Sequence, residues 1–339
     1  MGKNLVVFSD GTGLEGGVGE NTNVYKLFNM VEDRTASQIA FYDQGLGTGK
    51  TRKLLGKATG YGIKQNILEC YTFLFENYQA GDRIYLFGFS RGATTVRSLS
   101  GFVHLFGMLP KSRNDLIEQA YDIYTISDDV RRRSQADEFI ARHHTMWCKI
   151  KFLGVWDTVA ALGTPSRAIN VLLNATDWFK HEYHDLKLSE SVEHAYHALA
   201  IDDERQTFHP VLWDSEISDK QTMKQVWFCG MHTDVGGGYP SSDLSDIPLE
   251  WMTGHAVRHG LRLYPQHKIR VAGNVNGTMH DSRGSFITRL YRQKVRFWPE
   301  GREDRPCVHN SVMQRTRNRH NSDDPSYRPW VLDVPHDVD

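Results

Sequence analysis

Four short apolar runs in this sequence each end at a residue that can do chemistry. The runs NLVVFSD, RIYLFGFS, KIKFLGVWD and KQVWFCGMH end at Asp10, Ser90, Asp157 and His232. Runs of this length that are apolar almost throughout are typical of strands buried on both faces. The carboxyl ends of parallel strands share one edge of a sheet, and ligands bind there. We therefore expect these four side chains to gather at one edge of a parallel sheet.

Segments with a helical pattern alternate with the apolar runs. Apolar residues recur at helical spacing over 60–82, and further helices are expected over 91–107 and 246–260. Strands that alternate with helices predict an α/β fold, in which a mostly parallel central sheet carries helices on both faces.

The rest of the chain is expected to be peripheral to this sheet. Helical insertions are predicted at about 111–147 and 164–188, the second of them an amphipathic segment suited to a lid or a packed connecting helix. Residues 1–300 are expected to form the folded domain. The charged, proline-containing segment 301–339 is predicted to be a polar C-terminal tail without its own core.

Composition excludes several classes of protein. The 339 residues are 40% hydrophobic and 24% charged, as in an ordinary globular protein. Forty Lys and Arg against 41 Asp and Glu give a net charge of −1, so nothing in the overall charge points to nucleic acid. No apolar stretch approaches the roughly 20 residues of a membrane span. The four scattered cysteines are typical of a reducing compartment, so synthesis in the cytoplasm is expected, with secretion that needs no cleaved signal left open.

The segment GFSRG, residues 88–92, has the form G-x-S-x-G and lies between an apolar strand and a helix. That context is typical of a nucleophile elbow, in which a strained turn holds a serine hydroxyl above the edge of the sheet. Ser90 is therefore the candidate nucleophile, and a helix N-cap is the alternative role. The backbone N–H of Arg91 would face a developing oxyanion, and Gly11 or Thr12 in the early loop DGTG would supply a second donor. Asp10 would brace that loop.

A serine nucleophile needs a histidine base and an acid that orients it. Two pairs follow Ser90 in the order expected for this kind of fold, Asp157 with His232 and Asp234 with His280. The buried position expected for Asp157 favours the first pair, because a buried acid holds the imidazole tautomer and stabilises the imidazolium. Both pairs stay open at this point.

Other candidate sites are weaker. The segment GLGTGKT at 45–51 lacks the Walker A spacing, so no nucleotide and no other cofactor is expected. His194 and His197 lie three apart on an expected helix, and packing of the two side chains is favoured over a metal site. Glu204 and Arg205 are expected to form a local ion pair. The glycines of HTDVGGGY, residues 232–239, are expected to let backbone or substrate approach His232 closely.

Five motifs occur in order along the chain: FSDGTG, GFSRGA, LGVWDTV, HALAIDDER and VWFCGMHTDVGGGY. Together they resemble, from about residue 4 to 290, a large α/β-hydrolase-domain family that includes the phospholipase effectors of bacterial type VI secretion. The resemblance implies an α/β-hydrolase fold and an esterase or phospholipase that acts on acyl esters of glycerophospholipids. It also implies that the nucleophile is Ser90, the acid Asp157 and the base His232.

The predicted function is thus a serine ester hydrolase without metal or cofactor. Its expected partners are an acyl-ester or phospholipid substrate and a transient membrane contact, with no nucleic acid, and a secretion or immunity partner stays open. One alternative is a metal-dependent phosphoesterase that uses Asp10, Asp157, His232 and Asp234. The other is a non-catalytic member that keeps the site for binding.

Overall fold

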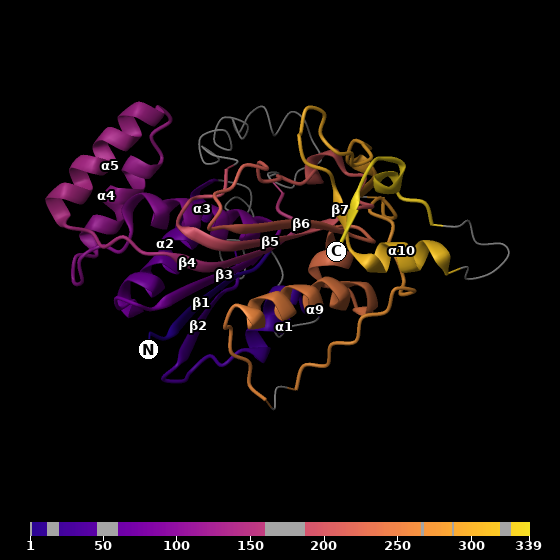
Figure 1. Ribbon diagram of the computed structural model, residues 1–339, viewed down its shortest axis with the longest axis horizontal. Coiled ribbons are helices and arrows are strands. Elements are labelled where there is room, and N and C mark those ends of the chain that lie inside the picture. The colour runs from indigo at the N-terminus through magenta and orange to yellow at the C-terminus, as the bar shows by residue number, and fades with distance from the viewer. Residues whose placement is uncertain are drawn as a thin grey trace.

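A computed structural model describes residues 2–11, 20–45, 60–159, 187–265, 268–286, 288–318 and 327–339. Within these ranges the chain forms one sheet of eight parallel strands in the order β2-β1-β3-β4-β5-β6-β7-β8 (Figure 1). The strands are β1 (Asn4–Ser9), β2 (Gln38–Asp43), β3 (Arg83–Phe89), β4 (Ile150–Trp156), β5 (Val192–Ala200), β6 (Thr222–Phe228), β7 (Cys307–Val308) and β8 (Asp337–Val338). The chain builds β2 on one side of β1 and all later strands on the other. The topological switch point, where α/β sheets bind ligands, therefore lies between β1 and β3.

Helices cover both faces of the sheet (Figure 1). One face is packed by α2 (Gly60–Asn77), α3 (Arg91–Phe106), α4 (Asp115–Tyr124) and α5 (Asp129–His143). The other face is packed by α1 (Asn23–Met30) and α9 (Asp243–Arg258). The fold is the predicted α/β-hydrolase architecture, a parallel central sheet between two helical layers.

The two helical layers explain why the strands are apolar at consecutive positions. In β1, Leu5 and Val7 point into the core beneath α2 and α3, whereas Val6 and Phe8 point into the core beneath α1 and α9. All four side chains are fully buried. Successive strand residues face opposite sides of a sheet, so a strand covered on both faces has no polar face to alternate with.

The helix expected around His194 and His197 is wrong, because these residues lie in the strand β5. A spacing of three puts two side chains on opposite faces of a strand, so the two imidazoles cannot share a metal ion. His194 stacks on His259, with ring centroids 3.6 Å apart, while fully buried His197 accepts a hydrogen bond from the backbone N–H of Thr158.

The prediction that residues 301–339 form a tail without a core is also wrong for the part of it that the structure describes. The strands β7 and β8 extend the sheet beyond β6, and α10 (Asn310–Arg317) packs beside them. Val308, Val312 and Val331 are fully buried in a third apolar cluster with residues of β5 and β6. Strands of two residues give no periodic pattern, which is why the charged sequence concealed them.

Of the two predicted insertions, the first is helical as expected and consists of α4 and α5. Leu116, Ile117, Tyr121 and Phe139 pack these helices onto the main core. The second insertion, at 164–188, lies outside the described residues except for Lys187 and Leu188.

Candidate active site

The carboxyl ends of adjacent strands bring most of the predicted residues to one edge of the sheet. Asp10, Ser90 and Asp157 directly follow β1, β3 and β4, which are neighbours in the sheet. His232 follows β6 after a short turn and begins the short helix α8 (His232–Gly236), which the sequence did not indicate. The site therefore lies beside the topological switch point.

Ser90 has the geometry of a nucleophile elbow. Its backbone lies at φ 58° and ψ −118°, an unfavourable region for a residue with a side chain, and its N–H donates to the carbonyl of Trp156 at 3.1 Å. A Cβ on Gly92 would lie 2.0 Å from the Ser9 carbonyl oxygen, and one on Gly88 would lie 2.4 Å from that of Gly92. Ser90 occupies the N-cap position of α3, but its side chain makes no capping bond, so the alternative N-cap role is not observed.

His232 and Asp157 form a direct contact, with 2.6 Å between Nδ1 of the imidazole and Oδ2 of the carboxylate. The histidine is almost completely buried, and the rings of Phe89 and Phe208 lie 4.6 and 5.2 Å from its centroid. Phe89 is the residue immediately before Ser90, so the imidazole lies next to the elbow. Since Asp157 engages Nδ1, Nε2 is the ring nitrogen left for proton transfer.

Asp157 is also clamped by an arginine that the sequence analysis did not identify. Nη1 and Nη2 of Arg296 donate to the two carboxylate oxygens at 2.7 and 2.9 Å, and the N–H of Ala200 donates to Oδ1 at 2.9 Å. The same guanidinium donates to the carbonyls of Ala200 and Phe208. Both Arg296 and Asp157 are buried, so this bidentate pair fixes the carboxylate that orients His232.

The clamp determines the charge of the acid. Burial by itself would raise the pKa of Asp157, but the charge of Arg296 and the hydrogen bonds from His232 and Arg296 hold that pKa well below its usual range. The carboxylate is therefore ionised at any pH at which the enzyme would work, as the partner of an imidazolium must be.

The second candidate pair exists as well. Oδ1 of Asp234 lies 2.6 Å from Nδ1 of His280, and Oδ2 accepts the backbone N–H groups of His280 and Met231. The His280 ring stacks on Tyr239 at 3.7 Å. His232 and Asp234 are two residues apart on α8, which turns about 200° over that spacing, so the two pairs face nearly opposite sides of the helix. Only the Asp157–His232 pair has a ring against the residue that precedes Ser90.

The glycines of HTDVGGGY allow close packing, but the groups that approach them lie at Gly236 and Gly237 rather than at His232. A Cβ on Gly236 would lie 2.0 Å from the Phe89 ring, and one on Gly237, at φ 82°, would lie 2.7 Å from the backbone nitrogen of Asn23. The first contact places α8 against Phe89, the residue before the elbow, and the second places the end of α8 against the start of α1.

Asp10 links the end of β1 to β2 and to the residue that caps α1, whereas most of the loop that it was expected to brace lies outside the described residues. Its carboxylate accepts the hydroxyls of Thr22 and Tyr42, each at 2.6 Å, and the N–H of Gly11 at 2.7 Å. Burial raises the pKa of Asp10 to about 6, although these hydrogen bonds oppose the shift. The N–H of Gly11 is thus engaged by Asp10 rather than directed at a substrate, and Thr12 lies outside the described residues. Arg91, the first residue of α3, stays the predicted oxyanion donor.

The four residues of the metal-dependent alternative do not share a site. Asp10 is bound by Thr22 and Tyr42, Asp157 by Arg296 and Asp234 by His280. In the part of the chain that the structure describes, no three His, Cys, Asp or Glu side chains form a group that could hold a metal ion.

The IDDER segment positions the loop that carries His232. Asp203 accepts the guanidinium of Arg205 through both oxygens and the backbone N–H of His232 at 3.3 Å. The predicted ion pair between Glu204 and Arg205 is therefore wrong, because Arg205 pairs with Asp203. Asp202 accepts the N–H of Gly230 and the hydroxyl of Tyr327, so both acids act on the turn before α8.

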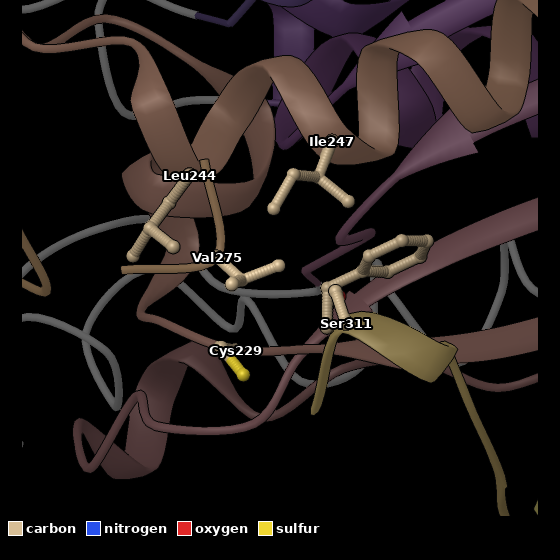
Figure 2. A pocket seen from close by; sticks show the side chains of 6 residues that line it. Cys229, Leu244, Ile247, Val275 and Ser311 are labelled. Atoms are coloured by element: carbon tan, nitrogen blue, oxygen red, sulfur yellow. The ribbon is translucent and has the colours of Figure 1, made fainter. Parts of the chain in front are cut away.

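An apolar hollow between β6, α9 and α10 is separate from this site (Figure 2). Phe228, Cys229, Leu244, Ile247, Val275 and Ser311 line it. Burial raises the pKa of the Cys229 thiol to about 12, so this cysteine is not a nucleophile at neutral pH.

Comparison with known proteins identifies the family. Residues 3–255 match the family described as "T6SS, Phospholipase effector Tle1-like, catalytic domain". The chain belongs to this Tle1-like family. The resemblance predicted from the five motifs is thereby confirmed, and a lipase-like hydrolase domain is the function class that goes with it.

One protein sequence and two solved structures are similar to this Tle1-like chain. An uncharacterized protein of Saccharomyces cerevisiae is 28% identical over 268 residues, which are 71% of this chain and 37% of the yeast protein. An uncharacterized protein from Pseudomonas aeruginosa aligns with a TM-score of 0.49 and 16% identity, over 80% of this chain and 49% of its own. The Tle1 effector bound to the VgrG spike of a type VI secretion system aligns with a TM-score of 0.39 and 18% identity, over 70% and 51%.

The chain thus spans about a third to a half of the length of these relatives. Among the helices that the structure describes, none combines the length and the apolar character needed to cross a bilayer.

Proposed function

We propose that this chain is a serine ester hydrolase that cleaves acyl esters of phospholipids, with Ser90 as nucleophile, His232 as general base and Asp157 as the acid that orients it. The observation that carries the proposal is the 2.6 Å contact between His232 and Asp157 beside the strained turn at Ser90. Membership of the Tle1-like family supports the phospholipid as substrate class.

In the proposed reaction, Nε2 of His232 takes the proton of the Ser90 hydroxyl as its oxygen attacks the ester carbonyl carbon. The resulting tetrahedral oxyanion accepts a hydrogen bond from the backbone N–H of Arg91, where the dipole of α3 favours negative charge. The imidazolium returns its proton to the leaving alcohol oxygen, which leaves an acyl ester on Ser90. Water, activated by the same imidazole, then releases the fatty acid.

The surroundings of the imidazole favour an apolar substrate. The rings of Phe89 and Phe208 flank His232, and burial lowers the pKa of Arg91 to about 10, so apolar groups surround the imidazole and the residue after Ser90 is largely removed from water. A secretion or immunity partner stays a prediction that rests on family membership alone.

The test is the substitution Ser90→Ala, assayed with a p-nitrophenyl ester and with phospholipid vesicles. We expect turnover to fall by about 10⁴-fold or more while the thermal midpoint stays near that of wild type. A fluorophosphonate should label the wild type and leave the variant unlabelled.

Two results would contradict the assignment. One is unchanged turnover in the Ser90→Ala variant. The other is turnover that a chelator abolishes while the fluorophosphonate leaves Ser90 unlabelled, which would favour the metal-dependent phosphoesterase. If Ser90→Ala loses turnover as expected, lipid profiling of wild type against Ser90→Ala would identify the acyl chain and the head group of the substrate.

A further inference from the structure

The segment from Arg283 to Phe297, here called the basic strap, exposes an unusual number of apolar side chains. Phe286 is 82% exposed, Leu290 58%, Val295 50% and Phe297 48%. These are four of the ten large hydrophobic side chains that are exposed in the described residues. Concentration of exposed apolar groups in one short segment marks an interaction site, whereas scattered ones need no explanation.

The same segment is strongly basic. Arg283, Arg289, Arg292 and Lys294 lie in it, and residues 282–299 contain no Asp or Glu. Within the described residues, the ion pair made by the strap is the one between buried Arg296 and Asp157. None of the four other cations forms an ion pair with a carboxylate of the described chain, although Glu204 accepts a hydrogen bond from Gln293 beside them; three of the four, Arg289, Arg292 and Lys294, are exposed.

The strap is anchored against the candidate active site. The backbone of Arg292 and Lys294 bonds to that of Gln206 and Glu204, and Arg296 reaches Asp157. Buried Tyr291 contacts Phe208 at 5.7 Å, and Phe208 in turn contacts His232 at 5.2 Å. A ligand bound to the strap would therefore be separated from the His232 imidazole by the rings of Tyr291 and Phe208.

The burial pattern of the strap is inverted at its last three positions. Arg296 is buried between exposed Val295 and exposed Phe297, although burial of the apolar pair would be the ordinary arrangement. Arg296 is buried because it binds the buried carboxylate of Asp157. Its neighbours Val295 and Phe297 therefore point toward solvent.

We propose that the basic strap docks this protein onto an anionic phospholipid surface. Phe286, Leu290, Val295 and Phe297 would enter the interface between headgroups and acyl chains, while Arg289, Arg292 and Lys294 pair with lipid phosphates. The proposal rests on the proposed function for its biological sense, because docking would bring acyl esters close to Ser90. The whole chain has a net charge of −1 and the strap holds five cations and no acid, so the rest of the chain is net negative and has no comparable overall attraction to such a surface.

The test is cosedimentation with vesicles, made in a Ser90→Ala background so that hydrolysis does not alter the lipid. Vesicles of phosphatidylcholine alone are compared with vesicles that also contain phosphatidylglycerol. We expect binding to the second kind, weakened by salt. The triple variant Arg289→Gln, Arg292→Gln and Lys294→Gln should bind on the order of 100-fold more weakly, at roughly fivefold per cation. The double variant Phe286→Ser and Leu290→Ser should bind more weakly at every salt concentration.

Helix α5 offers matched controls. Val130 is 80% exposed, and Arg131 and Arg133 are exposed beside it. The variants Val130→Ser and Arg131→Gln with Arg133→Gln remove the same kinds of group away from the strap, and should bind like the parent. Equal binding to both kinds of vesicle, or equal binding by strap and control variants, would overturn the proposal and favour a protein as the occupant.

Failure of the docking proposal is distinguishable from failure of the proposed function. With Ser90 restored, strap variants should hydrolyse a soluble ester as wild type does and lose activity only on vesicles. A strap variant that lost both activities equally would overturn docking as the role of the strap. Retained hydrolysis by Ser90→Ala would overturn the catalytic assignment and leave the binding result standing.

Discussion

Two Asp–His pairs flank the short helix α8, and their imidazole–carboxylate distances are the same. Asp157 with His232 and Asp234 with His280 each have 2.6 Å between Nδ1 and a carboxylate oxygen. Yet the pKa of Asp157 is lowered well below its usual range, whereas burial raises the pKa of Asp234. The decisive difference is Arg296, which binds both oxygens of Asp157, while Asp234 has two backbone N–H groups in place of a cation. The same short contact to histidine thus occurs with two different electrostatic surroundings, and the proposed function assigns the acid to the carboxylate that carries a cation.

Removal of each imidazole in turn should separate the two pairs by the largest effect. His232→Ala should lower kcat/KM on a soluble ester by about 10⁴-fold or more, because the proposed reaction has no other group to take the Ser90 proton. His280→Ala, the matched control, should change kcat/KM by less than about tenfold, because that ring faces the other side of α8. The measurement is the initial rate of both variants and of wild type, at low substrate for kcat/KM and at saturating substrate for kcat. The reverse ranking would assign the base to His280.

Much of this contrast could be predicted from the sequence. The strands β1, β3, β4 and β6 are apolar over most or the last part of their length; Ser90 and Asp157 directly follow β3 and β4, and His232 comes a short turn after β6. The G-x-S-x-G pattern predicts the elbow because only glycine fits at Gly88 and Gly92. These are local signals, in which a few consecutive residues determine the backbone path.

Arg296 could not be predicted in the same way. It binds Asp157 from 139 residues away and lies in a charged segment that is typical of a surface. Likewise β5 contains His194 and His197 at a helix-like spacing, and β7 and β8 are too short to have a period. These features depend on contacts between distant parts of the chain, so no short stretch of the sequence is enough to predict them. The one available signal is an arginine placed between Val295 and Phe297, and its meaning becomes clear only with the structure.

Removal of the clamp tests the decisive difference directly. Arg296→Met leaves a buried carboxylate without its cation, so we expect the free energy of unfolding to fall by about 3–5 kcal/mol. Arg296→Lys restores charge without the bidentate geometry, and should recover part of that loss. Arg302→Met is the control, because Arg302 forms a similar fork on Asp304 in a more exposed place and should cost about 1 kcal/mol or less.

The pH dependence of the same variants gives a second readout. The folded pKa of Asp157 lies below its unfolded value of about 3.9, so its contribution to stability is complete above that pH and is lost as the pH falls through the folded value. In Arg296→Met the carboxylate should protonate at higher pH, and the acid limb of kcat/KM should move upward with it. If Arg296→Met and wild type showed the same dependence on acid pH, both in the free energy of unfolding measured with urea and in kcat/KM, the clamp would have only a structural role.

The smallest effect is expected at the second pair. Asp234→Asn should lower the free energy of unfolding by about 1–2 kcal/mol at acid pH, because it weakens the bonds to His280 and to the Met231 N–H, and by less near neutral pH; it should change kcat/KM only severalfold. Since burial raises the folded pKa of Asp234, its contribution to stability is present in full below the unfolded value of about 3.9 and falls as the pH rises through the folded value. Urea unfolding of wild type and Asp234→Asn between acid and neutral pH measures this, and the variant should show the flatter dependence. A loss of activity as large as that of His232→Ala, with an unchanged unfolding curve, would show that the pair without a cation is the catalytic one.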